Sequence, residues 1–340
     1  MKKFLLSALV LAASTFAAHA IEGELSGKFI INTNGDSVHF SQGLLQYHEM
    51  TSKWSFAAHQ FKADNDALAY FGWGTSGWNS GANEYQPTST SADPADYFVG
   101  GNENNNLTGD YAYADWGIYN PIKNGGNFAG LWRVLTHEEW VYIIESRPNA
   151  GKLFGFATID NQYKGVILLP DEWVLPSGVT FKPGTDCYME YETGNGWRNL
   201  NLDMQTNYND NKYTLEQWET MEEAGAVFFP AMGYLTGGEI RYPNDFGYYA
   251  SSTARNGYTE YAMEFDNKSL LASDGAARRG NGISVRLVTR PDSDYQGIDN
   301  AQSHKAAKKI LRDGQVLILM DGKQLNILGA EVKYQITNNK

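Results

Sequence analysis

The sequence predicts an α+β fold in which a few helices pack against mixed antiparallel sheets. Short runs of alternating apolar residues are separated by turn sequences such as Asn34-Gly35, a pattern typical of β-hairpins. Two segments, starting at Thr136 and Thr214, combine a helix cap with a following apolar stripe. Apolar runs between residues 248 and 288 then supply the strands that close the sheet.

The N-terminal β region covers residues 21–60. Alternating or clustered apolar residues predict strands at residues 28–33, 37–40, 44–48 and 53–56. Their spacing indicates consecutive antiparallel hairpins.

The amino-acid composition changes after the predicted hairpins. Residues 66–71 form a short apolar run before Gly72, and we expect a short helix there. Residues 74–110 are polar and rich in Gly, Asn, Ser and Thr, which predicts a long surface loop.

The first predicted helix runs to Arg147 and begins at Thr136. Glu139 follows three residues later, so the two side chains form a capping box. Trp140, Ile143 and Ile144 then occupy positions i, i+3 and i+4, which is one apolar helix face.

The second predicted helix covers residues 214–223, and its capping box pairs Thr214 with Gln217. The remaining predicted strands of the core cover residues 153–159, 165–169, 226–229, 248–252, 260–265 and 283–288.

Four regions follow from the chain's composition. Residues 1–20 have a basic start, an apolar stretch and Ala18-His19-Ala20 at the end, as in a secretory signal peptide. Residues 21–290 form the main domain, and the polar residues 291–303 form a linker. Residues 304–340 form a C-terminal β tail, because Asp-Gly pairs separate its apolar runs, with strands expected at 315–319, 323–328 and 330–336.

We therefore expect an exported protein in the periplasm, on the outer cell surface or outside the cell. No later segment is apolar over the roughly 18 residues that a stable membrane span needs. The net charge of −12 repels phosphate backbones, so nucleic acid is not an expected partner. Cys187 is the only cysteine, which excludes a disulfide within the chain.

Segments in a fixed order resemble the Fibrobacter succinogenes-type major paralogous domain family, a relative of the formylglycine-generating enzymes. Residues 132–140 (WRVLTHEEW) are similar to its helix motif, although Val134-Leu135 replaces the family's Leu-Pro. Residues 247–253 (GYYASST) and 282–286 (GISVR) are similar to its closing motifs, with Ala250 where Trp is usual. The resemblance covers roughly residues 28–288.

This resemblance implies a C-type-lectin-like domain with two helices, mixed sheets and long loops that form a binding face. The formylglycine-generating relatives use paired cysteines for oxidation, and Cys187 alone does not provide a pair. The tail, over residues 311–332, resembles the short C-terminal β unit of exported Bacteroidota proteins. A sorting signal and a structural cap remain equal alternatives for it.

The sequence contains few motifs that are typical of catalytic sites. The Gly-x-Ser-x-Gly motif of serine hydrolases does not occur, and Ser251-Ser252 has no nearby His in sequence. A glycan-active hydrolase that uses cleft carboxylates, for instance Glu138 or Asp245, stays an alternative. We otherwise expect no enzymatic activity.

We expect no cofactor and no catalytic metal. His39, His48 and His59 lie farther apart than the paired ligands of a typical zinc site. Residues 207–211 and 244–245 supply Asn and Asp oxygens, so structural calcium stays open, but turn chemistry explains these residues as well.

The favoured hypothesis is a secreted or cell-surface protein that binds a glycan or a protein surface. A structural or fimbrial envelope component is a further alternative, and the sequence leaves the oligomeric state open. Tyr and Arg suit recognition because they combine a large contact area with a polar tip. The predicted ligand-binding residues are Tyr248, Tyr249, Arg255, Asn256, Tyr258, Glu260 and Arg278.

Overall fold

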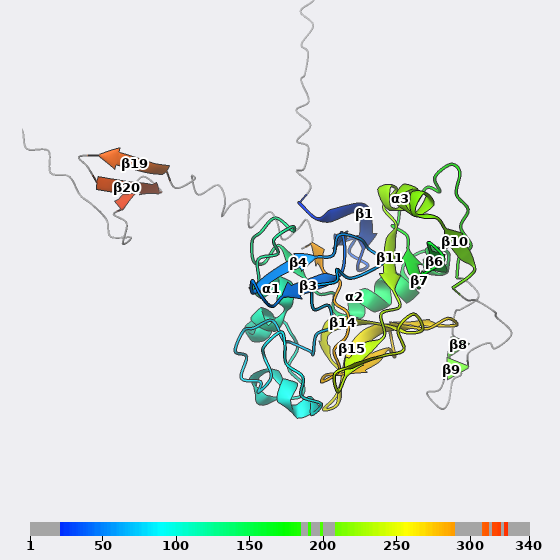
Figure 1. Ribbon diagram of the computed structural model, residues 1–340, viewed down its shortest axis with the longest axis horizontal. Helices are drawn as coiled ribbons and strands as arrows, with labels where there is room; N and C mark the ends of the chain where they lie inside the picture. Colours follow the sequence, from blue (N-terminus) through cyan, green and yellow to red (C-terminus); the bar gives the residue numbers. More distant parts are fainter. Residues whose placement is uncertain are drawn as a thin grey trace, which may run out of the picture.

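A computed structural model describes residues 21–184, 190–191, 198–199, 208–289, 308–312, 315–320 and 323–325. The fold is α+β, with few helices and several antiparallel sheets, as the sequence predicts (Figure 1). The predicted signal peptide, the linker at residues 291–303 and Cys187 lie outside the described residues.

One sheet joins the beginning, the middle and the end of the main domain. Strands β1 (Glu24–Ile30) and β2 (Ser37–Ser41) form the predicted first hairpin. Strand β2 also pairs with β18 (Val288–Thr289), which in turn pairs with β5 (Trp132–Arg133). The two ends of the main domain therefore belong to one sheet, because its last strand, β18, pairs with β2.

The second predicted hairpin is present as β3 (Leu45–His48) and β4 (Lys53–Phe56). The helix expected at residues 66–71 is wrong. Leu68 and Tyr47 exchange backbone hydrogen bonds at 2.9 Å in both directions, so this segment extends along β3. These inter-segment hydrogen bonds occupy the backbone groups that a helix would use locally.

The polar residues 74–110 form a long loop, as predicted, with short 3₁₀ turns. These are η1 (Pro94–Tyr97), η2 (Val99–Gly101) and the start of η3 (Gly109–Ala114). Helix α1 (Trp116–Tyr119) follows the loop. Its first turn is capped by Asp115, whose carboxylate accepts from the backbone N–H groups of Gly117 in α1, at 2.9 Å, and of Val134 directly after β5, at 2.8 Å.

The second sheet has the order β10-β6-β7-β11 and provides much of the core. Its members are β10 (Asn211–Tyr213), β6 (Phe154–Ile159), β7 (Tyr163–Leu168) and β11 (Val227–Pro230). Every residue of β6 and β11 is buried, as is typical of strands whose two faces are both covered. Helix α3 (Leu215–Glu223) begins at the predicted Thr214–Gln217 capping box.

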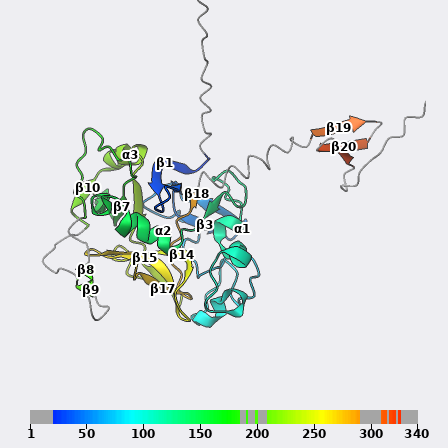
Figure 2. The same ribbon diagram turned by 180° about the vertical axis from the view of Figure 1, so that it is seen from behind.

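Helix α2 (His137–Val141) begins at the predicted Thr136–Glu139 capping box and continues as a π-turn, η4 (Tyr142–Ser146). The predicted stripe of Trp140, Ile143 and Ile144 is buried. Figure 1 and Figure 2 show the molecule from opposite sides. In both views α2 lies between β7 and the strands formed by residues 247–265.

The closing sheet contains β14 (Gly247–Ala254), β15 (Thr259–Phe265), β16 (Leu270–Leu271) and β17 (Ala276–Arg278). The first two strands agree with the prediction. All three neighbours pair with β15 in antiparallel register, so β15 is the centre of this sheet.

The continuous strand predicted at residues 283–288 is wrong. Ile283 bridges to Phe71, Ser284 bridges to β14, and only Val288 enters a ladder. This segment passes from one sheet to another, so its backbone changes partners almost residue by residue. It is buried throughout, which explains why its composition resembles that of a strand.

The C-terminal tail has three antiparallel strands, β19 (Lys308–Arg312), β20 (Gln315–Met320) and β21 (Lys323–Leu325). The predicted central hairpin is present, and β19, ahead of it, was not predicted. The strand expected at 330–336 lies outside the described residues. Strands β8 (Glu190–Tyr191) and β9 (Arg198–Asn199) form a further antiparallel pair.

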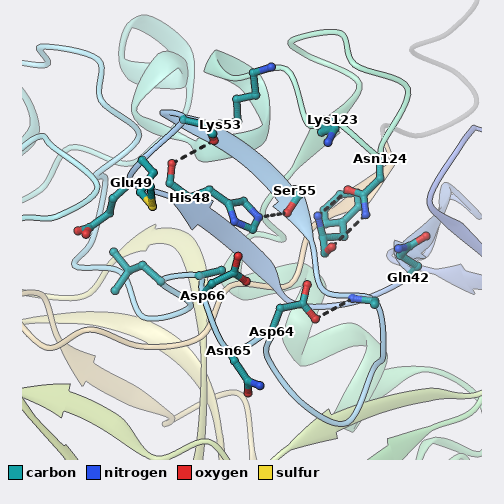
Figure 3. A pocket seen from close by; sticks show the side chains of 16 residues that line it. Gln42, His48, Glu49, Lys53, Ser55, Asp64, Asn65, Asp66, Lys123 and Asn124 are labelled. Atoms are coloured by element: carbon teal, nitrogen blue, oxygen red, sulfur yellow. Dashed lines mark hydrogen bonds between the residues drawn. The ribbon is translucent and has the colours of Figure 1, made fainter.

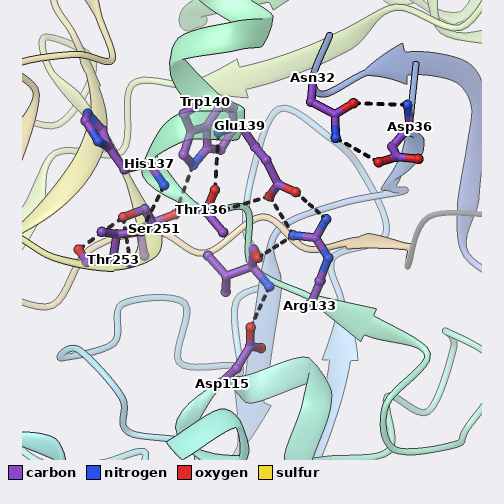
Figure 4. Close-up of polar contacts among 12 residues, drawn as sticks. Asn32, Asp36, Asp115, Arg133, Thr136, His137, Glu139, Trp140, Ser251 and Thr253 are labelled. Atoms are coloured by element: carbon purple, nitrogen blue, oxygen red, sulfur yellow. Dashed lines mark hydrogen bonds and ion pairs between the residues drawn. The ribbon is translucent and has the colours of Figure 1, made fainter. Parts of the chain in front are cut away.

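The beginning of α2 lies directly against β14. The backbone N–H of Ser252 donates to the Leu135 carbonyl at 2.9 Å, and the N–H of His137 donates to the Thr253 hydroxyl at 3.1 Å (Figure 4). The Trp140 indole donates to a β14 carbonyl at 3.2 Å. These contacts bring together the two segments on which the sequence resemblance depends.

None of the helices in the described part of the chain has the length and apolar character that crossing a bilayer requires.

Candidate functional site

A cavity of about 460 Å³ lies where the closing sheet meets β12 (Tyr234–Thr236), and we call it the sheet cavity. Strand β12 forms a hairpin with β13 (Glu239–Arg241). The cavity is lined by aromatic, hydroxyl, amide and guanidinium groups together with small apolar residues. The lining residues are Tyr234, Thr236, Tyr248, Thr259, Ala276, Ala277, Arg278, Asn281 and Ile283.

Backbone pairing positions these side chains. Thr259 on β15 lies opposite Arg278 on β17 in the antiparallel register, so cross-strand neighbours provide part of the lining. Leu235 and Gly282 exchange backbone hydrogen bonds of 2.7 and 2.8 Å, which attach β12 to the edge of the cavity. A Cβ atom at Gly282 would lie only 3.0 Å from Tyr70, so glycine permits this close approach.

Tyr248 is half-buried and is fixed by the neighbouring strand. Glu264 lies opposite it on β15, and the two side chains share a hydrogen bond. Burial, reinforced by the Glu264 carboxylate, raises the pKa of Tyr248 above its ordinary value. The phenol therefore stays neutral and donates to Glu264, which leaves the ring as its contribution to the cavity.

Tyr248 belongs to an aromatic group of four side chains beside the cavity. Tyr234 contacts Tyr248 edge to face, with ring centroids 5.6 Å apart, and Tyr242 at 6.0 Å. Phe246 contacts both Tyr242, at 5.3 Å, and Tyr248, at 6.2 Å. Tyr242 is 55% exposed, so part of this aromatic group is open to solvent.

Arg278 is the only charged residue among the described residues that line the sheet cavity. Its side chain is exposed and forms no ion pair with any of the residues that the structure describes. The cavity therefore combines one unpaired cation with aromatic rings and neutral hydrogen-bonding groups.

Two of the seven predicted ligand-binding residues, Tyr248 and Arg278, come together in this cavity. Arg255, Asn256 and Tyr258 lie on the adjacent turn between β14 and β15, where all three are exposed. The Asn256 carboxamide oxygen accepts from the backbone of the following residues at 2.9 and 3.0 Å, so it stabilises the turn.

The other two predicted residues, Tyr249 and Glu260, belong to the interior, and both are 0% exposed. The Tyr249 hydroxyl donates to the Pro230 carbonyl at 2.8 Å, and its ring packs on Phe229 at 4.9 Å. Side chains alternate between the two faces of a strand, so Tyr248 faces the cavity and Tyr249 the core. A ligand on the surface does not reach either buried residue.

Sequence reasoning did not single out Tyr234, Thr236 or Asn281 as ligand-binding residues. One available signal was Gly237-Gly238, because two glycines between short apolar runs are typical of a two-residue hairpin turn. Both residues have positive φ angles, 56° and 80°, as such a turn requires. This signal predicts the β12–β13 hairpin that carries Thr236, but not its position beside the closing strands.

The carboxylates of the hydrolase alternative lie elsewhere. Glu138 is exposed in the first turn of α2, and Asp245 is exposed in the turn before β14. Neither lines the sheet cavity. Ser251 and Ser252 are buried in β14, where the Ser251 hydroxyl accepts from the Thr253 backbone at 3.1 Å.

Metal-binding candidates are also dispersed. The described residues contain no group of three or more His, Cys, Asp or Glu side chains arranged to hold a metal ion. His48 bonds to Ser55 at 2.8 Å, and His59 stacks on Phe61. Asn211, considered for calcium, is buried and uses its amide to bond to backbone carbonyls at 2.9 Å.

A second, larger cavity of about 850 Å³ lies beside the β3–β4 hairpin, and we call it the hairpin cleft (Figure 3). It carries both signs of charge, with Lys53 and Lys123 among the bases and Asp64 and Asp66 among the acids. Asn124 bonds through both amide atoms to the Phe56 backbone, at 2.7 and 2.9 Å. The inner polar groups of the cleft thus stabilise the hairpin itself.

No protein-family model matches the chain, and comparison with curated proteins and with solved structures finds no similar protein.

Proposed function

We propose that this protein is an exported, non-catalytic binding protein that recognises a glycan or a protein surface through the sheet cavity. The observation that carries the proposal is the composition of that cavity. Tyr234 and Tyr248 supply aromatic area, Thr236 and Asn281 supply neutral hydrogen-bonding groups, and Arg278 supplies one cation. A concave site with a few convergent polar groups is typical of ligand recognition.

The composition favours binding over hydrolysis. The described residues of the lining include no carboxylate, no thiol and no imidazole. Glycoside hydrolysis normally uses two carboxyl groups on opposite sides of the scissile bond. The residues of the sheet cavity therefore suit recognition better than acid–base chemistry.

We further propose that the main domain has a C-type-lectin-like fold. The contact between the start of α2 and β14 supports this proposal, since the resembled helix and closing motifs become neighbours. The pairing of β2 with β18 supports it too, because it brings the two ends of the domain into one sheet. Export is proposed from the composition of residues 1–20.

Thr236→Trp tests the binding site. The indole would fill part of the sheet cavity, so we expect at least a tenfold loss of affinity for any glycan or protein that the purified chain binds in array screens. Ile240→Trp is the matched control, because Ile240 lies on the other strand of the same hairpin and is 48% exposed. Ile240 pairs with Leu235, so its side chain lies on the face opposite Thr236.

Equal binding by both variants and the unmodified protein would contradict a ligand site in the sheet cavity. Turnover of a bound glycan would contradict the non-catalytic part of the proposal. The melting temperatures of the two variants show whether a loss of binding reflects unfolding.

A further inference from the structure

We propose that the ligand of the sheet cavity is a saccharide that carries a carboxylate, and that Arg278 binds this carboxylate. This inference rests on the proposed function and specifies its ligand class. Uronic acids and sialic acids both present a carboxylate on a pyranose ring, and this is the chemistry that the cavity would recognise.

The charge of the cavity supports an anionic ligand. Among the described residues, Arg278 is the only charged one in the lining, and no acid pairs with it. A guanidinium can donate two parallel hydrogen bonds to a carboxylate, which gives both strength and orientation. The nearest cross-strand neighbour of Arg278 is Thr259, which is neutral, so nothing in the register competes for the cation.

The other exposed arginines near the closing sheet differ in this respect. Arg241 forms an ion pair with Glu239 at 2.6 Å, and the Arg255 guanidinium lies over the Tyr261 ring, 5.6 Å from its centroid. Both already have a partner, and neither lines the cavity. Arg278 is therefore distinguished from them by its position and by its lack of a partner.

The neutral part of the cavity suits a sugar ring. The rings of Tyr234 and Tyr248 meet edge to face, at an interplanar angle of 85°, and both line the cavity, where they supply aromatic area for the C–H face of a pyranose. The Thr236 hydroxyl and the Asn281 amide have no hydrogen-bond partner among the described residues and are available to sugar hydroxyls. The Thr259 hydroxyl already donates to Asn256 at 3.1 Å.

Shape favours a saccharide over a protein surface. The volume of about 460 Å³ falls within the roughly 300–1,000 Å³ of small-molecule sites. A typical protein interface instead covers about 800 Å² on each partner. The net charge of −12 opposes an acidic ligand only weakly, because physiological salt largely screens repulsion between charges more than about 8 Å apart.

Titration calorimetry on the full chain tests the inference. The probes are a tetrasaccharide of alternating glucuronic acid and N-acetylglucosamine, its carboxyl-reduced form, sialyllactose and lactose. We expect one acidic probe to bind about 10- to 100-fold more tightly than its neutral counterpart, which corresponds to a charge-assisted hydrogen-bonded pair. The two acidic probes distinguish a uronic from a sialic acid.

Arg278→Gln should reduce the affinity for that acidic probe by the same factor of about 10 to 100. The affinity for the neutral counterpart should not change. Arg241→Gln is the matched control, since Arg241 is also exposed, forms an ion pair with Glu239 and lies outside the cavity. We expect this control to bind like the unmodified protein.

Equal affinity for acidic and neutral probes would overturn the inference, and so would an acidic ligand that binds Arg278→Gln normally. The absence of binding to both acidic probes would overturn it as well. If Thr236→Trp still abolishes binding of a neutral glycan or a protein, the proposed function stands while the ligand class is wrong.

Discussion

Glu260 is a carboxylate buried at the centre of the closing sheet, and neither of its oxygens has a hydrogen-bond partner in the described structure. Burial raises its pKa well above the ordinary value of 4.5, although the charge of Arg279 acts in the opposite direction. Arg279 is itself buried, and its guanidinium lies 4.4 Å from the centroid of Trp73. The Arg279 guanidinium donates to the carbonyls of Glu103 in the 74–110 loop and of Thr259 in β15, so Glu260 and Arg279 lie where this loop meets the sheet.

The raised pKa of Glu260 makes stability depend on pH. Above about pH 4.5 the folded protein keeps a proton that the unfolded chain releases, so its stability falls as the pH rises. Glu260→Gln removes this titration. We expect denaturation experiments to show that the variant gains stability relative to the unmodified protein between pH 5 and pH 8, by up to about 1.4 kcal/mol per pH unit.

Glu219→Gln is the control, because Glu219 is an exposed carboxylate on α3. A constant difference between Glu260→Gln and the unmodified protein across this pH range would contradict the assigned role of Glu260.

Glu260 also shows why the ligand-binding residues could be predicted only in part. Glu260 and Ala262 are buried, whereas Tyr261 between them is partly exposed. In sequence, a carboxylate next to tyrosines resembles a surface position. Arg279, which acts on Glu260, and Trp73, on which Arg279 packs, come from other segments of the chain, and no local sequence pattern indicates that packing.

At the scale of elements, the cap of α2 connects two segments of the fold. The Thr136 hydroxyl accepts from the Glu139 backbone at 3.2 Å, and the Glu139 carboxylate accepts from the Thr136 backbone at 2.8 Å. The same carboxylate binds the Arg133 guanidinium through two contacts of 2.6 and 2.7 Å (Figure 4). The cap therefore fixes β5 relative to α2.

Thr136→Ala should lower the free energy of unfolding by about 1 kcal/mol, the usual cost of a lost N-cap. Thr214→Ala removes the corresponding hydroxyl of α3, where the capping contacts are exposed. We expect a smaller loss there, since water can replace the cap. Urea denaturation measures both, and a larger effect at Thr214 would contradict the connecting role of the α2 cap.

The elements that could be predicted are those specified by neighbouring residues. Both capping boxes and both N-terminal hairpins carry their signals within a few positions, and all are present. The predictions at residues 66–71 and 283–288 were wrong because distant partners decide those conformations. Leu68 pairs with β3, and Ile283 pairs with Phe71.

At the scale of the whole molecule, the sheet cavity combines three stretches of chain that meet only through folding. Tyr234 and Thr236 come from β12, Tyr248 from β14, and the remaining lining residues from residues 259–283. The sequence predicted the closing strands but not the hairpin that completes the cavity. Its position depends on the two hydrogen bonds between Leu235 and Gly282, which no sequence pattern indicates.

The most direct test of the sheet cavity as the ligand site is hydrogen–deuterium exchange with and without the acidic saccharide that binds most tightly. We expect added protection in β12 and in residues 276–283, with little change in β3 and β4. Protection confined to the hairpin cleft, or absent from both cavities while the saccharide is bound, would contradict the account.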